Sequence, residues 1–274
     1  MQTKYHPEYL LNGSPDEGLS VLDRSFAYGD GVFRTLLIRH GDPAHWDLHY
    51  SKLRNDCKRL KIDCPDESLI LEDIKCLFKL GGSGVIKIIV SRGESDRGYA
   101  VPANIKSNRF VIKLPAPSYP AVNVDEGVKL FLCNIRLSKQ PALAGIKHLN
   151  RLENVMARME WSDPDFTDGL LLDENGFVIE GTMSNVFARF GNVLLTPDLS
   201  QSGVAGVTRE CILTMSDALG LDVKVQAFTL DQLLEADEVI ICNTLFGAWQ
   251  VRALSNKLWN KQILASKIRS LLKG

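Results

Sequence analysis

Three prolines stand within residues 115–120, and this short segment constrains the fold more than any other part of the chain. Proline fixes φ at about −65° and disfavours helix in the residue before it, so the segment is predicted to be an extended linker. We therefore expect a smaller lobe over residues 1–114 and a larger lobe over residues 121–274. A chain of 274 residues, 45% of them hydrophobic, is long enough to give both lobes a core.

The smaller lobe is predicted to mix helices and strands. Apolar residues at helical spacing predict a helix over residues 48–60 and a second over residues 66–79, directly after Pro65. Apolar runs rich in β-branched residues predict strands over residues 85–90 and 109–114. The expected fold class is therefore α+β.

The larger lobe is predicted to be rich in strands, with helices packed outside. Strands are expected over residues 128–133, 169–172, 177–179, 186–190, 193–196, 223–228 and 238–242. Helices are expected over residues 148–161, 208–219 and 261–272, and Gly220 closes the second of them. Because strands and helices do not repeat in β-α-β order, a doubly wound parallel sheet is disfavoured.

The charge balance and the cysteines exclude several classes of protein. The 32 Lys and Arg residues against 33 Asp and Glu leave no basic excess for nucleic acid. No apolar run approaches the roughly 20 residues of a membrane helix, and residues 1–7 lack the apolar core of a signal peptide. The six cysteines form no C-x-x-C pair, so we expect reduced thiols and a cytoplasmic protein.

Residues 203–210 have the character of an anion-binding turn. Gly203 and Gly206 let the backbone approach a ligand closely, and they stand directly before the predicted helix that begins at Thr208. Amides at a helix N-terminus attract anions, so the segment can hold a phosphate. A plain turn with Thr208 as the N-cap explains the same residues and is favoured by this segment alone. The chain contains neither a P-loop pattern nor a G-x-S-x-G elbow.

Three charged side chains are further candidates for chemistry. Lys147 follows an apolar stretch, and desolvation there would make its amine nucleophilic. Glu180 shares a strand face with Val178, so its carboxylate is predicted to point inward and to need a partner. Arg97 lies in a polar loop and could grip a carboxylate. Taken singly, each is explained better by an ordinary position: a surface lysine at a helix start, an exposed carboxylate at a strand end and a solvated loop arginine.

His45 and His49 have the H-x-x-x-H spacing that can place two imidazoles on one helical face. The Glu of the H-E-x-x-H motif is missing, and no third ligand is apparent in the sequence. We therefore expect no metal site, and His49 is interpreted as a residue at the start of a helix.

The order of these segments carries more information than any one of them. In sequence order, the matching segments are residues 23–33, 145–153, 180–187, 203–209 and 236–243. Together they resemble the class IV aminotransferase family of pyridoxal-phosphate enzymes, and the resemblance spans nearly the whole chain. It implies the two-lobed fold type IV and a pyridoxal 5'-phosphate cofactor.

The resemblance also implies roles for individual residues around the cofactor. Lys147 would form the Schiff base, and Glu180 would pair with the pyridine nitrogen and keep it protonated. Val207 and Thr208, at a helix N-terminus, would bind the phosphate, with a further contact from Thr244.

Three more residues follow from the resemblance. Arg97 and Tyr99 lie where related enzymes hold the substrate carboxylate. Lys52 occupies the position at which the family often has an arginine that reaches the phosphate. A lysine is a point charge without the bidentate fork of arginine, so a weaker or missing contact is expected there.

Two segments, residues 91–99 and 143–151, are most similar to the lyase branch of the family. The function implied is conversion of 4-amino-4-deoxychorismate, a small-molecule substrate, to 4-aminobenzoate and pyruvate in folate biosynthesis. A D-amino acid or branched-chain aminotransferase is the nearest alternative, and a non-catalytic binding protein on the same scaffold is the second. The resemblance further implies a homodimer.

Overall fold

The structure is a computed structural model that describes residues 8–79 and 81–273. The chain divides into two compact units, and the division between Pro117 and Ser118 falls inside the predicted linker. Unit 1 contains the described residues up to Pro117 together with Lys147–Asn150, and unit 2 contains Ser118–Ile146 and the residues from Arg151 onward. Residues 147–150 were expected in the larger lobe, but they pack with unit 1. The expectation about a signal peptide concerns residues 1–7, which lie outside the described residues.

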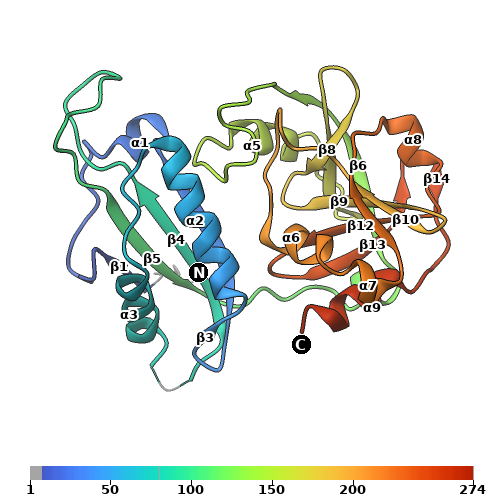
Figure 1. Cartoon of the computed structure of the whole chain (residues 1–274), viewed down its shortest axis with the longest axis horizontal. Helices are drawn as coiled ribbons and strands as arrows, with labels where there is room; N and C mark the ends of the chain where they lie inside the picture. Colours follow the sequence, from blue (N-terminus) through green and yellow to red (C-terminus); the bar gives the residue numbers. More distant parts are fainter. Residues whose placement is uncertain (1–7, 80, 274) are drawn as a thin grey trace. The chain divides into compact units, whose positions relative to one another are not determined.

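Unit 1 is built on a five-stranded antiparallel sheet with the order β1-β5-β4-β2-β3 (Figure 1). The strands are β1 (Tyr9–Leu11), β2 (Gly31–Arg39), β3 (Asp42–Pro43), β4 (Gly84–Ser91) and β5 (Asn108–Leu114). The helices are α1 (Arg24–Tyr28), α2 (Trp46–Leu60) and α3 (Glu67–Leu77). Helix α2 packs on β2 and α3 packs on β5. The two helices and two strands predicted for this part of the chain are confirmed, apart from small shifts at their ends.

Strand β2 is absent from the sequence prediction, although it lies between β4 and β3 in the sheet. Val32, Leu36 and Ile38 are buried on one of its faces, and Arg34 occupies the remaining buried position of that row. A charged residue there interrupts the alternation by which a half-buried strand is recognised. The burial of Arg34 requires an anionic partner, which Asp56 of α2 supplies.

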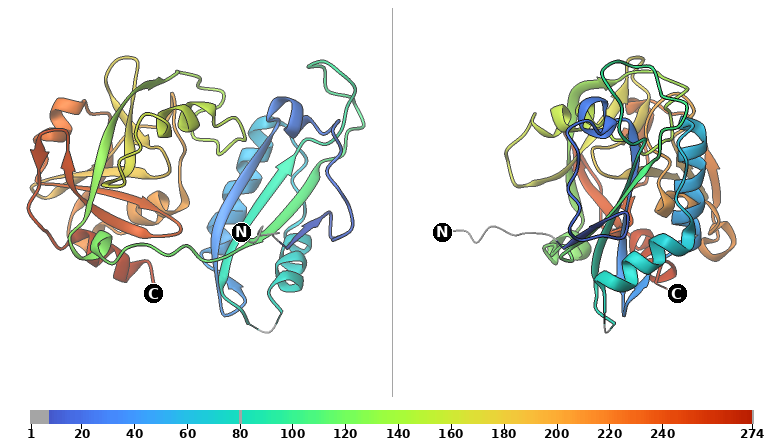
Figure 2. Two further views of the ribbon diagram at one scale, coloured as in Figure 1. Left: turned by 180° about the vertical axis from the view of Figure 1, so that it is seen from behind. Right: turned by 90° about the vertical axis from the view of Figure 1, so that its left-hand side faces the viewer.

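Unit 2 is built on a nine-stranded mixed sheet with the order β11-β10-β9-β12-β13-β6-β7-β8, and β14 pairs with β13. Figure 2 shows the ribbon of each unit from two further sides. The strands are β6 (Val128–Leu137), β7 (Phe166–Asp173), β8 (Val178–Gly181), β9 (Asn185–Phe190), β10 (Val193–Thr196), β11 (Asp222–Val225), β12 (Glu238–Asn243), β13 (Gly247–Leu254) and β14 (Lys257–Leu258). The helices are α4 (Val122–Asp125), α5 (Leu152–Arg158), α6 (Val207–Leu213), α7 (Ser216–Leu219), α8 (Leu230–Leu234) and α9 (Leu264–Leu271). Each predicted strand of this part is present, whereas β13 and β14 were missed.

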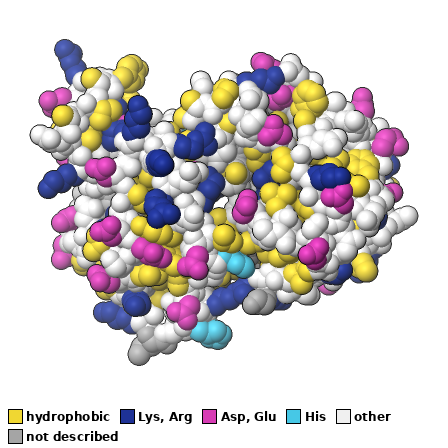
Figure 3. All heavy atoms as spheres, in the orientation of Figure 1, with side chains coloured by type: hydrophobic (Ala, Val, Ile, Leu, Met, Phe, Trp, Pro, Cys, Tyr) yellow, Lys and Arg dark blue, Asp and Glu magenta, His cyan; other side chains and the backbone are white. Residues whose placement is uncertain are grey.

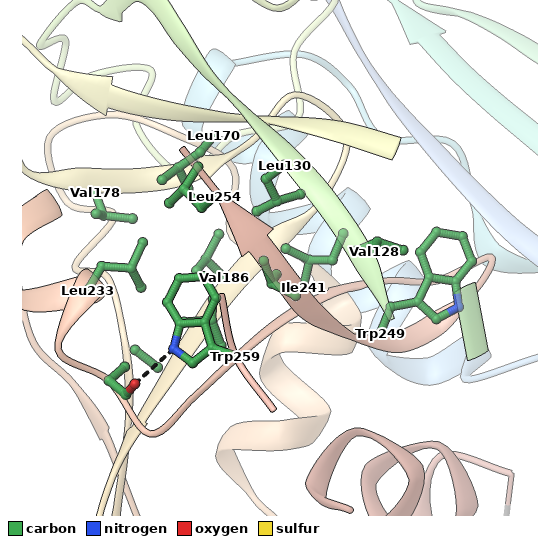
Figure 4. Packing of buried hydrophobic residues seen from close by; sticks show 14 of the residues in the cluster. Val128, Leu130, Leu170, Val178, Val186, Leu233, Ile241, Trp249, Leu254 and Trp259 are labelled. Carbon is green, nitrogen blue, oxygen red and sulfur yellow. Dashed lines mark hydrogen bonds between the residues drawn. The ribbon is translucent and has the colours of Figure 1, made fainter. Parts of the chain in front are cut away.

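The sheet of unit 2 is covered by apolar side chains on both faces. Ile241 of β12 belongs to one buried cluster with Trp249 and Trp259, and its neighbour Ile240 belongs to a second cluster under α6 and α9. Figure 4 shows the first cluster, in which Trp259 donates its indole N–H to the carbonyl of Ala236 at 2.8 Å. Burial on both faces explains why β12 reads as an unbroken apolar run rather than an alternating one.

Two predicted helices of unit 2 differ from the structure. Over residues 148–161 only α5 is helical, because residues 147–150 run beside β2: Phe33 donates its backbone N–H to the carbonyl of Lys147, and Leu149 donates to that of Gly31. The helix predicted over residues 208–219 is broken into α6 and α7, since the Thr214 hydroxyl bonds back to the Cys211 carbonyl at the end of α6.

The remaining global features concern charge, membranes and thiols. Side chains of both signs occur across the visible face of each unit (Figure 3). Among the described residues, no helix has the length and apolar character needed to cross a membrane. All six cysteines are free thiols. Over the same residues, no three His, Cys, Asp or Glu side chains come together as a ligand set for a metal ion.

The core of unit 2 gives a first prediction. Leu130 of β6 is fully buried in the first cluster, whereas Leu258 of β14 is 75% exposed. Leu130→Ala leaves a cavity and is expected to lower the free energy of unfolding by about 2–5 kcal/mol. Leu258→Ala is the matched control, with an expected change below about 0.5 kcal/mol. Urea denaturation of the three proteins checks both values, and equal midpoints for the two variants would contradict the assignment of this core.

His49 gives a second prediction because it is buried on α2. The two ring nitrogens have no hydrogen-bond partner among the described residues. Burial, followed by the positive charges of Arg34, His45 and Lys147, lowers the pKa of His49 to about 3. The unfolded chain takes up a proton near pH ~6.5 and the folded chain does not, so stability that is present above that pH is lost as the pH falls.

We expect the free energy of unfolding to fall by roughly 2 kcal/mol more between about pH 6.5 and pH 5 in the parent protein than in His49→Gln. Denaturant titrations at four pH values measure this difference. His45→Gln, at an exposed neighbouring histidine, is expected to retain the parent's slope. A parallel pH dependence in the parent and His49→Gln would show that His49 does not titrate in this way.

Candidate functional site

The backbone of Lys147 is fixed on both sides within unit 1. Its N–H donates to Oδ2 of Asp56 at 3.1 Å, and its carbonyl accepts from the N–H of Phe33 at 2.9 Å. The Nζ atom lies 4.6 Å from the centre of the Phe33 ring, at a distance typical of a cation–π contact. Lys147 is therefore held by β2 and α2. The sequence had predicted that it stands at the start of a helix, and this is wrong.

Asp56 is the centre of a buried group of charges. It is fully buried, and its two oxygens contact the guanidinium of Arg34 and the ammonium of Lys52. Burial, then the positive charges of Arg34, Arg59 and Lys147, holds the pKa of Lys52 below its usual range. The carboxylate of Asp56 thus joins β2 and α2 directly beside the backbone of Lys147.

Glu180 is buried at the end of β8, as its alternation with Val178 predicted. Its Oε2 accepts a 2.8 Å hydrogen bond from the backbone N–H of Val204. The neighbouring Gly203 has a φ of +80°, and a Cβ there would lie 2.7 Å from Ile179. Only glycine fits this position, so the turn and the carboxylate are placed together. Burial lowers the pKa of Arg151, and the negative charge of the nearby Glu180 opposes that shift.

The turn before α6 is held from two directions. Asn185 of β9 accepts a hydrogen bond from the N–H of Gly206 and donates one to the carbonyl of Val204. Gly145 donates to the Gly203 carbonyl at 2.8 Å and accepts from Ala205 at 3.1 Å. Because Lys147 follows Gly145 by two residues, the chain itself limits its Cα to about 7 Å from that of Gly145.

The first turn of α6 presents two of the candidate phosphate ligands. The N-cap is Gly206, so Val207 and Thr208 are the first helical residues, and the interpretation of Thr208 as the N-cap is wrong. The hydroxyl of Thr208 lies 3.5 Å from the hydroxyl of Thr244, which directly follows β12. Two hydroxyls at this spacing interact weakly with each other and can both donate to an anion.

Arg97 and Tyr99 lie on an exposed loop after β4. The ring of Tyr99 packs against Tyr28, with 5.3 Å between the ring centres. The buried guanidinium of Arg24 donates to the backbone carbonyls of Gly98 and Tyr99 and so holds the loop. Arg97 and Tyr99 therefore belong to a positioned loop of unit 1.

Sequence reasoning gave no role to three residues of these groups, namely Arg34, Asp56 and Arg151. A signal for Asp56 existed, since it follows Lys52 by four residues on one face of α2. Arg34 would have been found by reading β2 as an alternating strand that carries a buried charge. Arg151 stood inside a matched segment, but nothing local distinguishes it from a surface arginine.

Comparisons with known proteins agree with these features. The profile of the family described as "Amino-transferase class IV" matches residues 31–254. An aminodeoxychorismate lyase of Vibrio harveyi is 38% identical over 90% of this chain and 91% of its own length. A putative branched-chain-amino-acid aminotransferase of Methanocaldococcus jannaschii is 30% identical over 85% and 83%.

Among solved structures, 4-amino-4-deoxychorismate lyase from Pseudomonas aeruginosa superposes with a TM-score of 0.92. It is 42% identical, and the match covers 97% of this chain and 98% of that one. The fold of the present chain is therefore the two-lobed α+β fold expected from the sequence. Since the family profile covers most of the sequence and relatives match at this level over both units, the chain belongs to the class IV aminotransferase family.

Proposed function

We propose that the protein is a pyridoxal-phosphate-dependent lyase that converts 4-amino-4-deoxychorismate to 4-aminobenzoate and pyruvate. The similarity to the two lyases carries this proposal, because it spans nearly the whole chain and exceeds that to the aminotransferase. The product is a folate precursor, so the reaction would belong to folate biosynthesis.

The residues present fit a pyridoxal-phosphate cofactor. Glu180 offers a buried carboxylate whose orientation is fixed by Val204, which suits a protonated ring nitrogen. Thr208 and Thr244 offer two converging hydroxyls for a phosphate, together with the amides of the first turn of α6. Lys147 offers the amine for the aldehyde. When bound, the cofactor supplies an electron-withdrawing ring that accepts electrons from the substrate.

The role of Lys147 in the reaction would be to move a proton. With the cofactor bound, the Lys147 amine would accept the proton from C4 of the substrate. The bond between the ring and the enolpyruvyl oxygen would then break, and the leaving enolpyruvate would take up a proton to become pyruvate. The ring becomes aromatic, which makes the step strongly downhill. A backbone held at both its N–H and its carbonyl suits a side chain that must act at one defined atom.

The remaining expected ligands keep the roles that the family resemblance implies. Arg97 and Tyr99 are proposed to bind a substrate carboxylate, and their loop is held by Arg24. Lys52 is proposed as a cationic phosphate ligand, in place of the arginine often found in the family. Val207 would contribute its backbone amide.

We further propose that the protein is a cytoplasmic homodimer. The six free thiols support a reducing compartment. The dimer follows from family resemblance.

The alternative function is a D-amino acid or branched-chain aminotransferase with the same cofactor. The 30% identity to the putative branched-chain aminotransferase favours it over unrelated activities. The two functions differ in the state of the cofactor after one turnover. A transaminase leaves it as the amine, and a lyase returns it to its lysine-bound form.

Adding 4-amino-4-deoxychorismate to the purified holoenzyme is expected to release pyruvate and 4-aminobenzoate in equal amounts. The visible absorbance of the lysine-bound cofactor should be restored when the substrate is consumed. Coupled detection of pyruvate and the spectrum measure both. Lasting conversion to the amine form of the cofactor, with no pyruvate, would overturn the lyase proposal and favour the aminotransferase.

The assignment of Lys147 has its own control within this assay. Lys147→Ala should lose the visible band and at least roughly a thousandfold in rate, since it removes the group that binds the cofactor and moves the proton. Lys58→Ala, at an exposed lysine of α2, should match the parent protein. A normal band in Lys147→Ala would assign the cofactor to another lysine.

Glu180→Gln keeps an acceptor for the Val204 N–H but removes the negative charge opposite the ring nitrogen. We expect kcat to fall by at least about a hundredfold, because a neutral partner no longer holds the ring nitrogen protonated. Glu174→Gln, at an exposed turn of the same hairpin, should leave kcat unchanged. Steady-state pyruvate release gives both values, and equal kcat for the two variants would remove Glu180 from the cofactor site.

A further inference from the structure

We propose that Asp56 is a positioning residue that holds Lys147 by its backbone amide. The meaning of this role for catalysis rests on the proposed function, in which Lys147 carries the cofactor. The contact itself is independent of that function, because it involves only residues of unit 1.

The two hydrogen bonds on the peptide groups of Lys147 come from different elements. Asp56 of α2 accepts from the Lys147 N–H at 3.1 Å, and β2 donates to the Lys147 carbonyl through the Phe33 N–H at 2.9 Å. The bond to Phe33 is an ordinary backbone contact that any sequence could make. The bond to Asp56 depends on one side chain, so it is the part of this arrangement that the sequence specifies.

The carboxylate of Asp56 is itself kept in place by charge. It is fully buried, and an isolated anion there would be strongly disfavoured. Arg34 contacts Oδ2, the same oxygen that accepts from Lys147, and Lys52 contacts Oδ1. Ionised carboxylates accept several hydrogen bonds at once, so these three donors can be satisfied together.

Arg34 has a further feature that points to this purpose. It is 2% exposed, and its Nε has no hydrogen-bond partner among the described residues. A buried guanidinium with an unsatisfied N–H costs stability, and such exceptions call for an explanation. The contact of its Nη2 with Asp56 offsets part of that cost and holds the carboxylate oxygen to which the Lys147 amide donates.

Unit 1 contains a matched pair that serves as a control. Arg109 of β5 donates from Nε to Oδ2 of Asp73 on α3 at 2.6 Å, and both side chains are buried. Like Asp56 and Arg34, this pair joins a helix to a strand of the same sheet. Removing Asp73 therefore reproduces the loss of a buried ion pair without removing the acceptor of the Lys147 amide.

The test compares two uncharged double variants, Arg34→Met/Asp56→Asn and Arg34→Met/Asp56→Leu. Asn and Leu have similar size, but only Asn offers a carbonyl oxygen to the Lys147 N–H. Hydrogen exchange of the Lys147 amide is measured relative to the Leu149 amide, whose bond to Gly31 is unchanged and reports overall stability. We expect the ratio of the Lys147 exchange rate to the Leu149 exchange rate to be at least roughly tenfold higher in the Leu variant than in the Asn variant. Equal ratios would overturn the proposal.

Single variants decide the matter if the Leu double variant does not fold. Asp56→Ala and Asp73→Ala each leave one buried arginine without its anion, and the proposal requires the Lys147-to-Leu149 exchange ratio to rise only in Asp56→Ala. A rise in both, or in neither, would assign Asp56 a general structural role.

Cofactor attachment separates this proposal from the proposed function. Pyridoxal phosphate is added to the cofactor-free proteins, the product is reduced with borohydride, and the modified lysine is identified by mass. The reference is the Arg34→Met single variant. Relative to it, the rate of attachment to Lys147 should be about tenfold lower in the Leu double variant and within about twofold in the Asn double variant. If the parent protein attaches no cofactor at Lys147, the proposed function fails and the exchange result still stands.

Discussion

The hydrogen bonds that hold residues 147–150 beside β2 are the constraint on which the candidate chemistry depends. A lysine side chain has four rotatable bonds, so its amine is defined only as well as the backbone that carries it. Here that backbone is paired with a sheet strand through Phe33 and with a buried carboxylate through Asp56. This arrangement requires that the carboxylate of Asp56 be buried. The side chains of Arg34 on β2 and Lys52 on α2 contact its two oxygens and offset the cost of removing it from water.

Unit 2 achieves the same precision by different means. Its candidate carboxylate, Glu180, is oriented by the backbone amide of Val204 in a glycine turn. The side chain of Asn185 clamps that turn, and the absence of a Cβ at Gly203 lets it pack against β8. Backbone amides and a carboxamide need no counterion, so these hydrogen bonds fix the turn without adding a charge.

The sequence predicted most elements in which the burial of each face is reflected directly in the pattern of apolar residues. Strand β12 was found because its buried run is apolar throughout, and β4 because apolar β-branched residues flank its single lysine, Lys87. The pattern failed where a local signal competed with tertiary contacts: Arg34 hid β2, and the apolar spacing after Lys147 suggested a helix that backbone pairing with β2 replaces. The inward orientation of Glu180 was predictable from strand alternation. For Asp56 the spacing to Lys52 was the one signal, since its other charged partner, Arg34, lies on a strand that the sequence did not reveal.

The path of the chain has a consequence for how such a protein can change over evolution. The chain leaves unit 1 after Pro117, returns to it for residues 147–150 alone, and leaves again at Arg151. A recombination event at the proline-rich linker would bring in a foreign β2 and α2 while keeping the native four-residue segment that must pair with them. The lysine segment and the first unit are thus bound to be inherited together, and the linker, although it looks like a natural joint, is a poor place to exchange modules.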